Sequence, residues 1–208
     1  MAINATDNGG TEFAPAPEGT HLARCTQVID LGTLFSKYYG KWSHKVLLGW
    51  ELCNELKDRD DGERGDPHLV WNQYSLSRHQ NANLRRDLES WRGRAFTADE
   101  LRGFDISALL GVPCMLSLVH SDGDGGKVYA NVQAVMALPK GTEVPAQMTE
   151  TKLYEIALHD DPAHKAVFDP FNDNLQLKIL SSQELGGHTA DQDAAVNKDP
   201  EPSNEVPF

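Results

Sequence analysis

Residues 81–111 read NANLRRDLESWRGRAFTADELRGFDISALLG, and the helical pattern of this stretch differs from the strand-like segments around it. Its apolar residues Leu84, Leu88 and Trp91 are spaced i, i+4 and i+7, which predicts a helix with one apolar face. Residues 97–100 (TADE) are typical of a helical start, with a capping side chain and acids in the first turn. A helical region is therefore expected here, in a chain whose other segments favour strands.

Strand-like segments lie on both sides of this helical region. They are rich in β-forming residues or alternate between polar and apolar residues at period two. The last two flank SDGDGG (residues 121–126), which indicates a hairpin turn. The five expected strands are Thr20–Leu31, Trp42–Cys53, Leu69–Arg78, Val112–His120 and Lys127–Leu138.

The resulting order is β-β-β-α-β-β, so a mainly β fold is expected. This is the order of the OB-fold, a five-stranded Greek-key barrel with a helical insert between strands three and four. A β-sandwich with an inserted helix would give the same order. We expect residues 1–18 to be a flexible arm, 19–180 the barrel with a C-terminal extension from residue 139, and 181–208 a disordered acidic tail.

The composition limits where this protein acts. The chain has 208 residues, a formal charge of −12, 39% hydrophobic residues and a mean hydropathy of −0.49. It has no apolar run of the roughly 20 residues that a membrane span needs, and MAINATDNGG at the N-terminus lacks the features of a signal peptide. We expect a cytoplasmic protein with no membrane partner, whose three cysteines are reduced and form no disulfide.

Aromatic residues on polar strand faces are the first candidates for a binding site. Alternation turns Trp71 and Tyr129 outward, whereas Trp50 and Tyr74 are expected in the core. Bases stack on exposed aromatic rings and cations hold phosphates. Burial of Trp71 and Tyr129 under the arm or the extension is the other interpretation. Lys45 and Gln73 share a face with Trp71, Lys127 and Asn131 accompany Tyr129, and Arg24 is placed with Thr26 and Val28.

The loop between the first two expected strands, GTLFSKYYGK (residues 32–41), interleaves aromatic and basic residues. In an OB-fold this loop borders the binding groove, so it suits a clamp on a nucleic-acid strand; the alternative is an ordinary loop packed on the barrel. With this loop, the candidate DNA-binding residues are Arg24, Lys37, Tyr38, Tyr39, Lys41, Lys45, Trp71, Gln73, Lys127, Tyr129 and Asn131.

The arginines near the helix have a different expected role. Arg78, Arg85, Arg86, Arg92, Arg94 and Arg102 are mixed with acids, which is typical of a salt-bridged helix more than of a phosphate site. Common nucleotide, hydrolase and metalloprotease motifs do not occur in the sequence. We therefore expect no catalytic residues, no metal and no cofactor.

The chain ends in an acidic segment with an apolar terminus. Residues 181–208 carry six acids against one cation, Lys198, and finish with Glu205, Val206, Pro207 and Phe208. This ending resembles the tails of bacterial and bacteriophage single-stranded DNA-binding proteins, although only one acid directly precedes the apolar residues. Residues 18–140 are also similar to small proteins of tailed-phage replication and recombination modules.

The resemblance implies a non-enzymatic protein that binds single-stranded DNA largely without sequence preference. It also implies that the tail recruits replication or recombination proteins, and it leaves a homo-oligomer open. Two other functions fit the sequence: an acidic DNA mimic that inhibits a host enzyme, and a metal-dependent nuclease. Exposed aromatics argue against a mimic, and a cluster of carboxylates would favour a nuclease.

Overall fold

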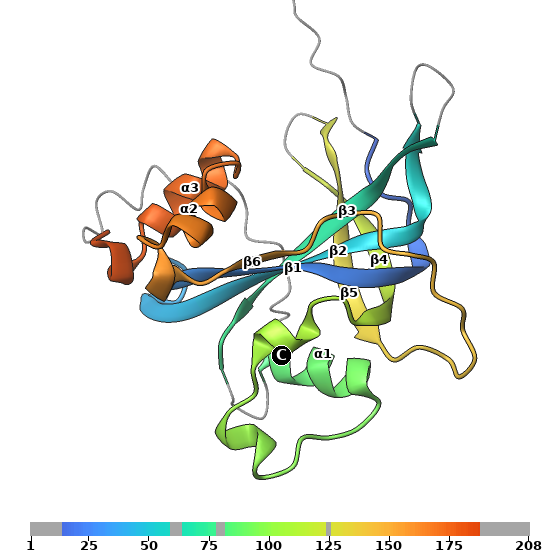
Figure 1. Ribbon diagram of the computed structural model, residues 1–208, viewed down its shortest axis with the longest axis horizontal. Helices are drawn as coiled ribbons and strands as arrows, with labels where there is room; N and C mark the ends of the chain where they lie inside the picture. The colour runs from blue at the N-terminus through green and yellow to red at the C-terminus, as the bar shows by residue number, and fades with distance from the viewer. Residues whose placement is uncertain (1–13, 59–63, 78–81, 124–125, 188–208) are drawn as a thin grey trace, which may run out of the picture.

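The computed structural model describes residues 14–58, 64–77, 82–123 and 126–187. In this part of the chain, six strands form one sheet in the order β3-β2-β1-β4-β5, with antiparallel neighbours, and β6 pairs with β1 in parallel (Figure 1). The mainly β expectation is confirmed. The strands are β1 Gly19–Ser36, β2 Lys41–Asp58, β3 Arg64–Ser75, β4 Pro113–Asp122, β5 Val128–Met136 and β6 Lys152–Tyr154.

The expected helix lies between β3 and β4. This is α1 (Asn83–Arg92), which ends at Gly93, a residue with φ +66° whose N–H bonds the last carbonyls. Two 3-10 helices follow, η1 (Glu100–Arg102) and η2 (Ile106–Leu109). The extension contains η4 (Ile156–Leu158), α2 (Pro162–Phe168), α3 (Asp173–Leu180) and η5 (Gln183–Leu185). Among the described helices, none is long and apolar enough to cross a bilayer.

The main core lies between the inner face of the sheet and α1, which Figure 1 shows beneath the sheet. Trp50 and Trp91 meet there with ring centroids 6.0 Å apart, and the Tyr74 hydroxyl donates to Asp87 Oδ2 at 3.0 Å. Trp50 and Tyr74 are thus core residues, as predicted. Ala16 is also buried in this core, so the end of the expected arm is packed against the sheet.

All three cysteines are free thiols, as predicted, and the structure buries all of them. Burial raises the pKa of Cys25 to about 12, and burial also raises the pKa of Cys114 well above its ordinary value. A thiol is nucleophilic only as the thiolate, so neither of these two is reactive near neutral pH.

A bulge in β1 overturns one expectation about its faces. The pairing with β2 skips a residue between Cys25 and Gln27, so the alternation shifts there by one residue. Cys25 and Val28 face the core, while Arg24 and Gln27 are on the outer face. The prediction that Arg24, Thr26 and Val28 share a face is therefore wrong, because strict alternation cannot anticipate an extra residue.

A second core joins the extension to the outer side of the β1–β2 hairpin. Both strands of this hairpin are longer than predicted. Helices α2 and α3 pack on the part of the hairpin that is near its turn (Figure 1). The fold continues past residue 180, because Ser182 is buried and Glu184 accepts hydrogen bonds from Thr33. The residues of this second core are Ile29, Leu31, Leu34, Tyr154, Ile156, Phe168, Phe171 and Ile179.

Residues 145–149, here called the strap, lie across the outer face of the sheet, away from the second core. Arg24 donates to the carbonyl of Pro145 at 2.7 Å. The carboxylate of Glu51, only 1% exposed, accepts the backbone N–H groups of Met148 and of Thr149, the latter at 2.7 Å. Since these bonds satisfy a buried charge, they hold the strap against the sheet.

Candidate nucleic-acid interface

An exposed tryptophan lies on the outer face of the sheet, between the strap and the second core. Trp71 on β3 pairs with Gly49 on β2, which in turn pairs with Gln27 on β1. The indole Nε1–H donates to Gln27 Oε1 at 3.1 Å. Trp71 remains 45% exposed. Within the described residues, neither the arm nor the extension buries this ring, which remains accessible.

Two further predicted residues share this face with Trp71. Gln73 follows two positions later on β3, where it pairs with Leu47. Lys45 lies two positions before Leu47 on β2, so it faces the same way, and it pairs with Ser75. Both side chains are half-buried. The structure therefore brings Lys45, Trp71 and Gln73 together on one surface, as strand alternation predicted.

The tip of the β1–β2 hairpin carries four of the predicted residues. Tyr38 is 83% exposed, and its ring meets that of Tyr39 edge-on with centroids 4.8 Å apart. Lys41 Nζ lies 4.9 Å from the centroid of the Tyr39 ring, a cation–π contact. Lys37 is exposed beside them. The tip is therefore a solvent-exposed group of aromatic and basic side chains.

The turn between β4 and β5 holds another group. Tyr129 is exposed and lies against the turn, where a Cβ added at Gly123 would come within 2.2 Å of the Tyr129 ring. Asn131 Nδ2 donates to Ser121 Oγ at 2.7 Å, and Lys127 is exposed. Tyr129 and Asn131 lie on β5, and Trp71 lies on β3. These two strands are at opposite ends of the sheet order, although they contact each other.

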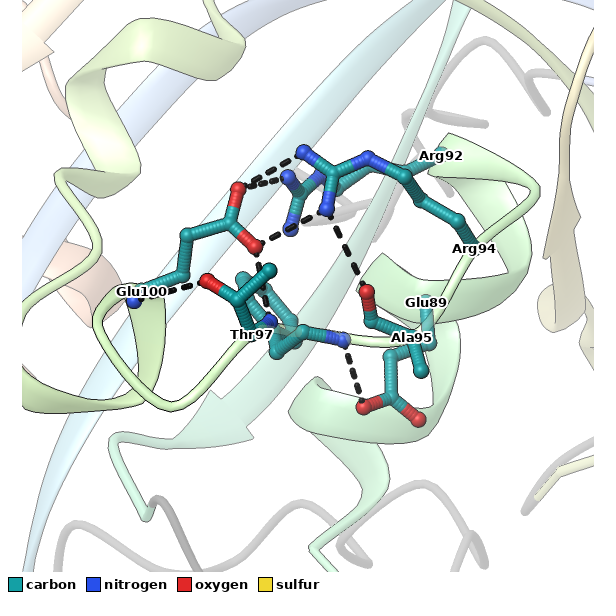
Figure 2. Close-up of polar contacts among 7 residues, drawn as sticks. Glu89, Arg92, Arg94, Ala95, Thr97 and Glu100 are labelled. Atoms are coloured by element: carbon teal, nitrogen blue, oxygen red, sulfur yellow. Dashed lines mark hydrogen bonds and ion pairs between the residues drawn. The ribbon is translucent and has the colours of Figure 1, made fainter.

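Arginines around α1 form ion pairs with acids on their own segment. Figure 2 shows the Glu100 carboxylate between Arg92 and Arg94, with the Thr97 N–H donating to the same carboxylate. These contacts hold the pKa of Glu100 well below its usual range, the bond from Arg94 contributing most. The salt-bridged interpretation is confirmed for the described arginines; Arg78 lies outside the described residues. The other pairs are Arg85–Glu89, Arg86–Asp87 and Arg102–Asp99.

A histidine links the hairpin to the end of the described extension. His44 Nε2 donates to Asp30 Oδ1 at 2.6 Å, and its Nδ1 lies 3.6 Å from Glu184 Oε1. The bond to Asp30 raises the pKa of His44 above 6.5. Burial opposes ionisation of Glu184, but hydrogen bonds from Thr33 and the charge of His44 together lower its pKa.

This link predicts a pH dependence of stability. Because the pKa of His44 is raised on folding, its stabilisation is complete below pH 6.5 and is lost as pH rises through the folded value. The pKa of Glu184 is lowered, so its share is lost only in acid, as pH falls below 4.5 through the lowered value. We expect the melting temperature to fall as pH rises above 6.5. His44→Gln should reduce this fall, and an equal fall in both proteins would contradict the prediction.

Neither the comparisons with known proteins nor the metal-ligating side chains of the described residues assign a function. No family model matches the chain, and no curated protein matches it. Within the described ranges, no three His, Cys, Asp or Glu side chains are grouped so as to hold a metal ion. The function is therefore inferred from the chain's own residues.

Three residues of the outer face and the hairpin tip had no predicted role in the sequence analysis. Trp42, exposed at the start of β2, was assigned to a strand and given no role. Gln27 was missed because the bulge is invisible to alternation. Gly49 carried a usable signal, since a glycine inside a strand often marks a close approach by another group.

Proposed function

We propose that this protein binds single-stranded DNA on the outer face of β2 and β3, without catalysis and largely without sequence preference. The exposed and anchored indole of Trp71 carries this proposal. A large aromatic ring on an open sheet face stacks with any base, because every base has a π-face. The proposed role of the chain is protection and handling of single strands during replication or recombination.

The arrangement of the strands supports an OB-type barrel. Its helix lies between β3 and β4, and the sheet order β3-β2-β1-β4-β5 becomes that of the OB-fold if β3 and β5 close the sheet. The contact between β3 and β5 favours such closure. In that fold the surface of strands two and three, with the loops beside it, is the usual nucleic-acid site, and here it carries Trp71.

The hairpin tip supports a clamp at one side of this surface. Tyr38, Tyr39 and Trp42 are exposed together with Lys37 and Lys41. Exposed aromatics interleaved with lysines offer both stacking and phosphate contacts. An acidic DNA mimic would have no use for such a group, so the tip favours binding of DNA over imitation of it.

The test is fluorescence anisotropy of labelled oligo-dT, about 30 nucleotides long to exceed the footprint of one barrel. We expect tight binding at low salt that weakens as salt rises, because phosphate contacts release counterions. Duplex DNA of equal length serves as the control and should bind much more weakly. Absence of binding at low salt, with and without the tail, would overturn the proposal.

The acidic tail is proposed to compete with DNA for the basic parts of this surface and to recruit partner proteins when DNA displaces it. Residues 188–208, including Glu205, Val206, Pro207 and Phe208, lie outside the described residues. We expect deletion of 188–208 to raise oligo-dT affinity at low salt, with the gain vanishing at high salt through screening. Neutralising the five tail acids to Asn and Gln is the matched control and should give the same gain. Unchanged affinity in both variants would contradict the competition.

A further inference from the structure

Four residues from four strands lie in one row across the outer face. Gln27 on β1 pairs with Gly49 on β2 and with Lys152 on β6, and Gly49 pairs with Trp71 on β3. In β6, Leu153 packs against the main core, so alternation puts its neighbour Lys152 on the outer side. The row therefore runs Lys152, Gln27, Gly49, Trp71, between the strap and the second core.

Gly49 is the residue that lets the indole lie across the sheet. A Cβ at this position would come within 2.7 Å of Trp71 Cδ1, 2.8 Å of its Nε1 and 3.0 Å of Gln27 Cβ. Distances under 3 Å are not tolerated, so any other residue would push the ring away. The backbone at Gly49 is not in the left-handed region, so an added methyl group acts through this clash and not through backbone strain.

Gln27 fixes the orientation of the ring about its own axis. Gln27 is 7% exposed, and its carboxamide oxygen accepts the indole N–H at 3.1 Å. The ring is thereby held before any ligand arrives, and a group ordered in advance loses less entropy on binding. Lys152, half-buried at the opposite end of the row, lies three strand spacings from Trp71, roughly 14 Å between backbones.

Building on the proposed function, we propose that Gly49 and Gln27 are positioning residues that preform Trp71 as a base-stacking platform. We further assign to Lys152, at the other end of the same row, a contact with a phosphate of the bound strand. The extension thus contributes to the DNA site through β6, a part of the chain for which the sequence analysis predicted no binding role.

The first test is Gly49→Ala, measured with oligo-dT alone and in combination with Trp71→Ala. We expect Gly49→Ala to weaken binding about 5- to 150-fold, the cost of one lost stacked base, and to add little when Trp71 is already alanine. Gly103→Ala is the matched control, because a Cβ there meets nothing within 4 Å. A full additional loss in the double variant would show that Gly49 acts through the sheet and would overturn its positioning role.

A second readout needs no DNA. In a Trp42→Phe background, Trp71 is the one exposed tryptophan, since Trp50 and Trp91 are buried. Quenching of its fluorescence by acrylamide should increase in Gly49→Ala and, to a smaller extent, in Gln27→Met, which lacks the acceptor. Unchanged quenching in both would overturn the positioning role, even if the wild-type protein binds DNA.

The third test concerns the cation. Lys152→Ala should weaken oligo-dT binding and lower the slope of log affinity against log salt by about one. Lys165→Ala, which removes an equal charge from exposed α2, should leave the slope unchanged. Equal slopes for both variants would overturn the phosphate contact while the proposed function stands. Failure of the wild-type protein to bind at low salt would instead remove the proposed function and this inference together.

Discussion

Replacement of Trp71 by alanine is expected to weaken the binding of oligo-dT about 5- to 150-fold, equivalent to about 1–3 kcal/mol for one stacked base. The loss should persist at high salt, because stacking is not screened. The unfolding midpoint should change little, since Trp71 is 45% exposed and its indole N–H makes a single neutral hydrogen bond, to Gln27, among the described residues. Anisotropy titrations across salt, with thermal unfolding in parallel, measure both effects.

Two variants make this result specific. Trp71→Phe keeps an aromatic face and should retain part of the affinity. Leu177→Ala removes another exposed apolar side chain, on α3 in the extension, and should bind like the wild type. Equal affinity of Trp71→Ala and the wild type would contradict a stacking role for this residue and remove the main support for the proposed function.

Replacement of Tyr154 by alanine is expected to destabilise the protein by about 3–5 kcal/mol, the usual cost of deleting a large buried aromatic side chain. Tyr154 is fully buried in the second core, with ring centroids 5.7 Å from Phe168 and 5.9 Å from Phe171. Its hydroxyl is hydrogen-bonded to His159 Nδ1 at 2.7 Å. Urea unfolding measures the loss, and limited proteolysis should show cleavage in residues 155–187 before cleavage within the strands β1 to β5.

Tyr154→Phe is the control for this prediction. It removes the bond to His159 but keeps the ring, so we expect a loss of only about 1 kcal/mol. If Tyr154→Ala unfolds at the same urea concentration as the wild type, the second core does not hold the extension to the hairpin.

The element order was largely predictable, because each element follows a local rule. Helix α1 has apolar residues at helical spacing, and the strands around it alternate or are rich in β-formers. The outward placement of Trp71 and Gln73 followed from the same alternation, since β3 is regular from Leu69 to Ser75. The exposed residues of the hairpin tip, Tyr38 and Tyr39, were found because their loop is dense in aromatics.

Other features could not be read from local patterns. The bulge after Cys25 moves Gln27 to the outer face, and its position depends on the pairing partner, not on β1 alone. Residues 174–180 alternate only weakly between polar and apolar residues, so local pattern does not separate strand from helix; in the structure they belong to α3, which packs on the hairpin. Arg24 was a candidate DNA contact, but its guanidinium bonds Pro145 in the strap, more than a hundred residues away.

Local sequence patterns were sufficient to predict the mainly β order, the helix between the third and fourth strands, the unpaired cysteines and the candidate aromatic residues. These depend on side-chain periodicity and composition over short windows. Only the tertiary structure brought Lys152, Gln27, Gly49 and Trp71 into one row, and only it attached the extension to the hairpin. Such contacts join residues far apart in the chain, so their energy arises only after the strands pair and the two cores close.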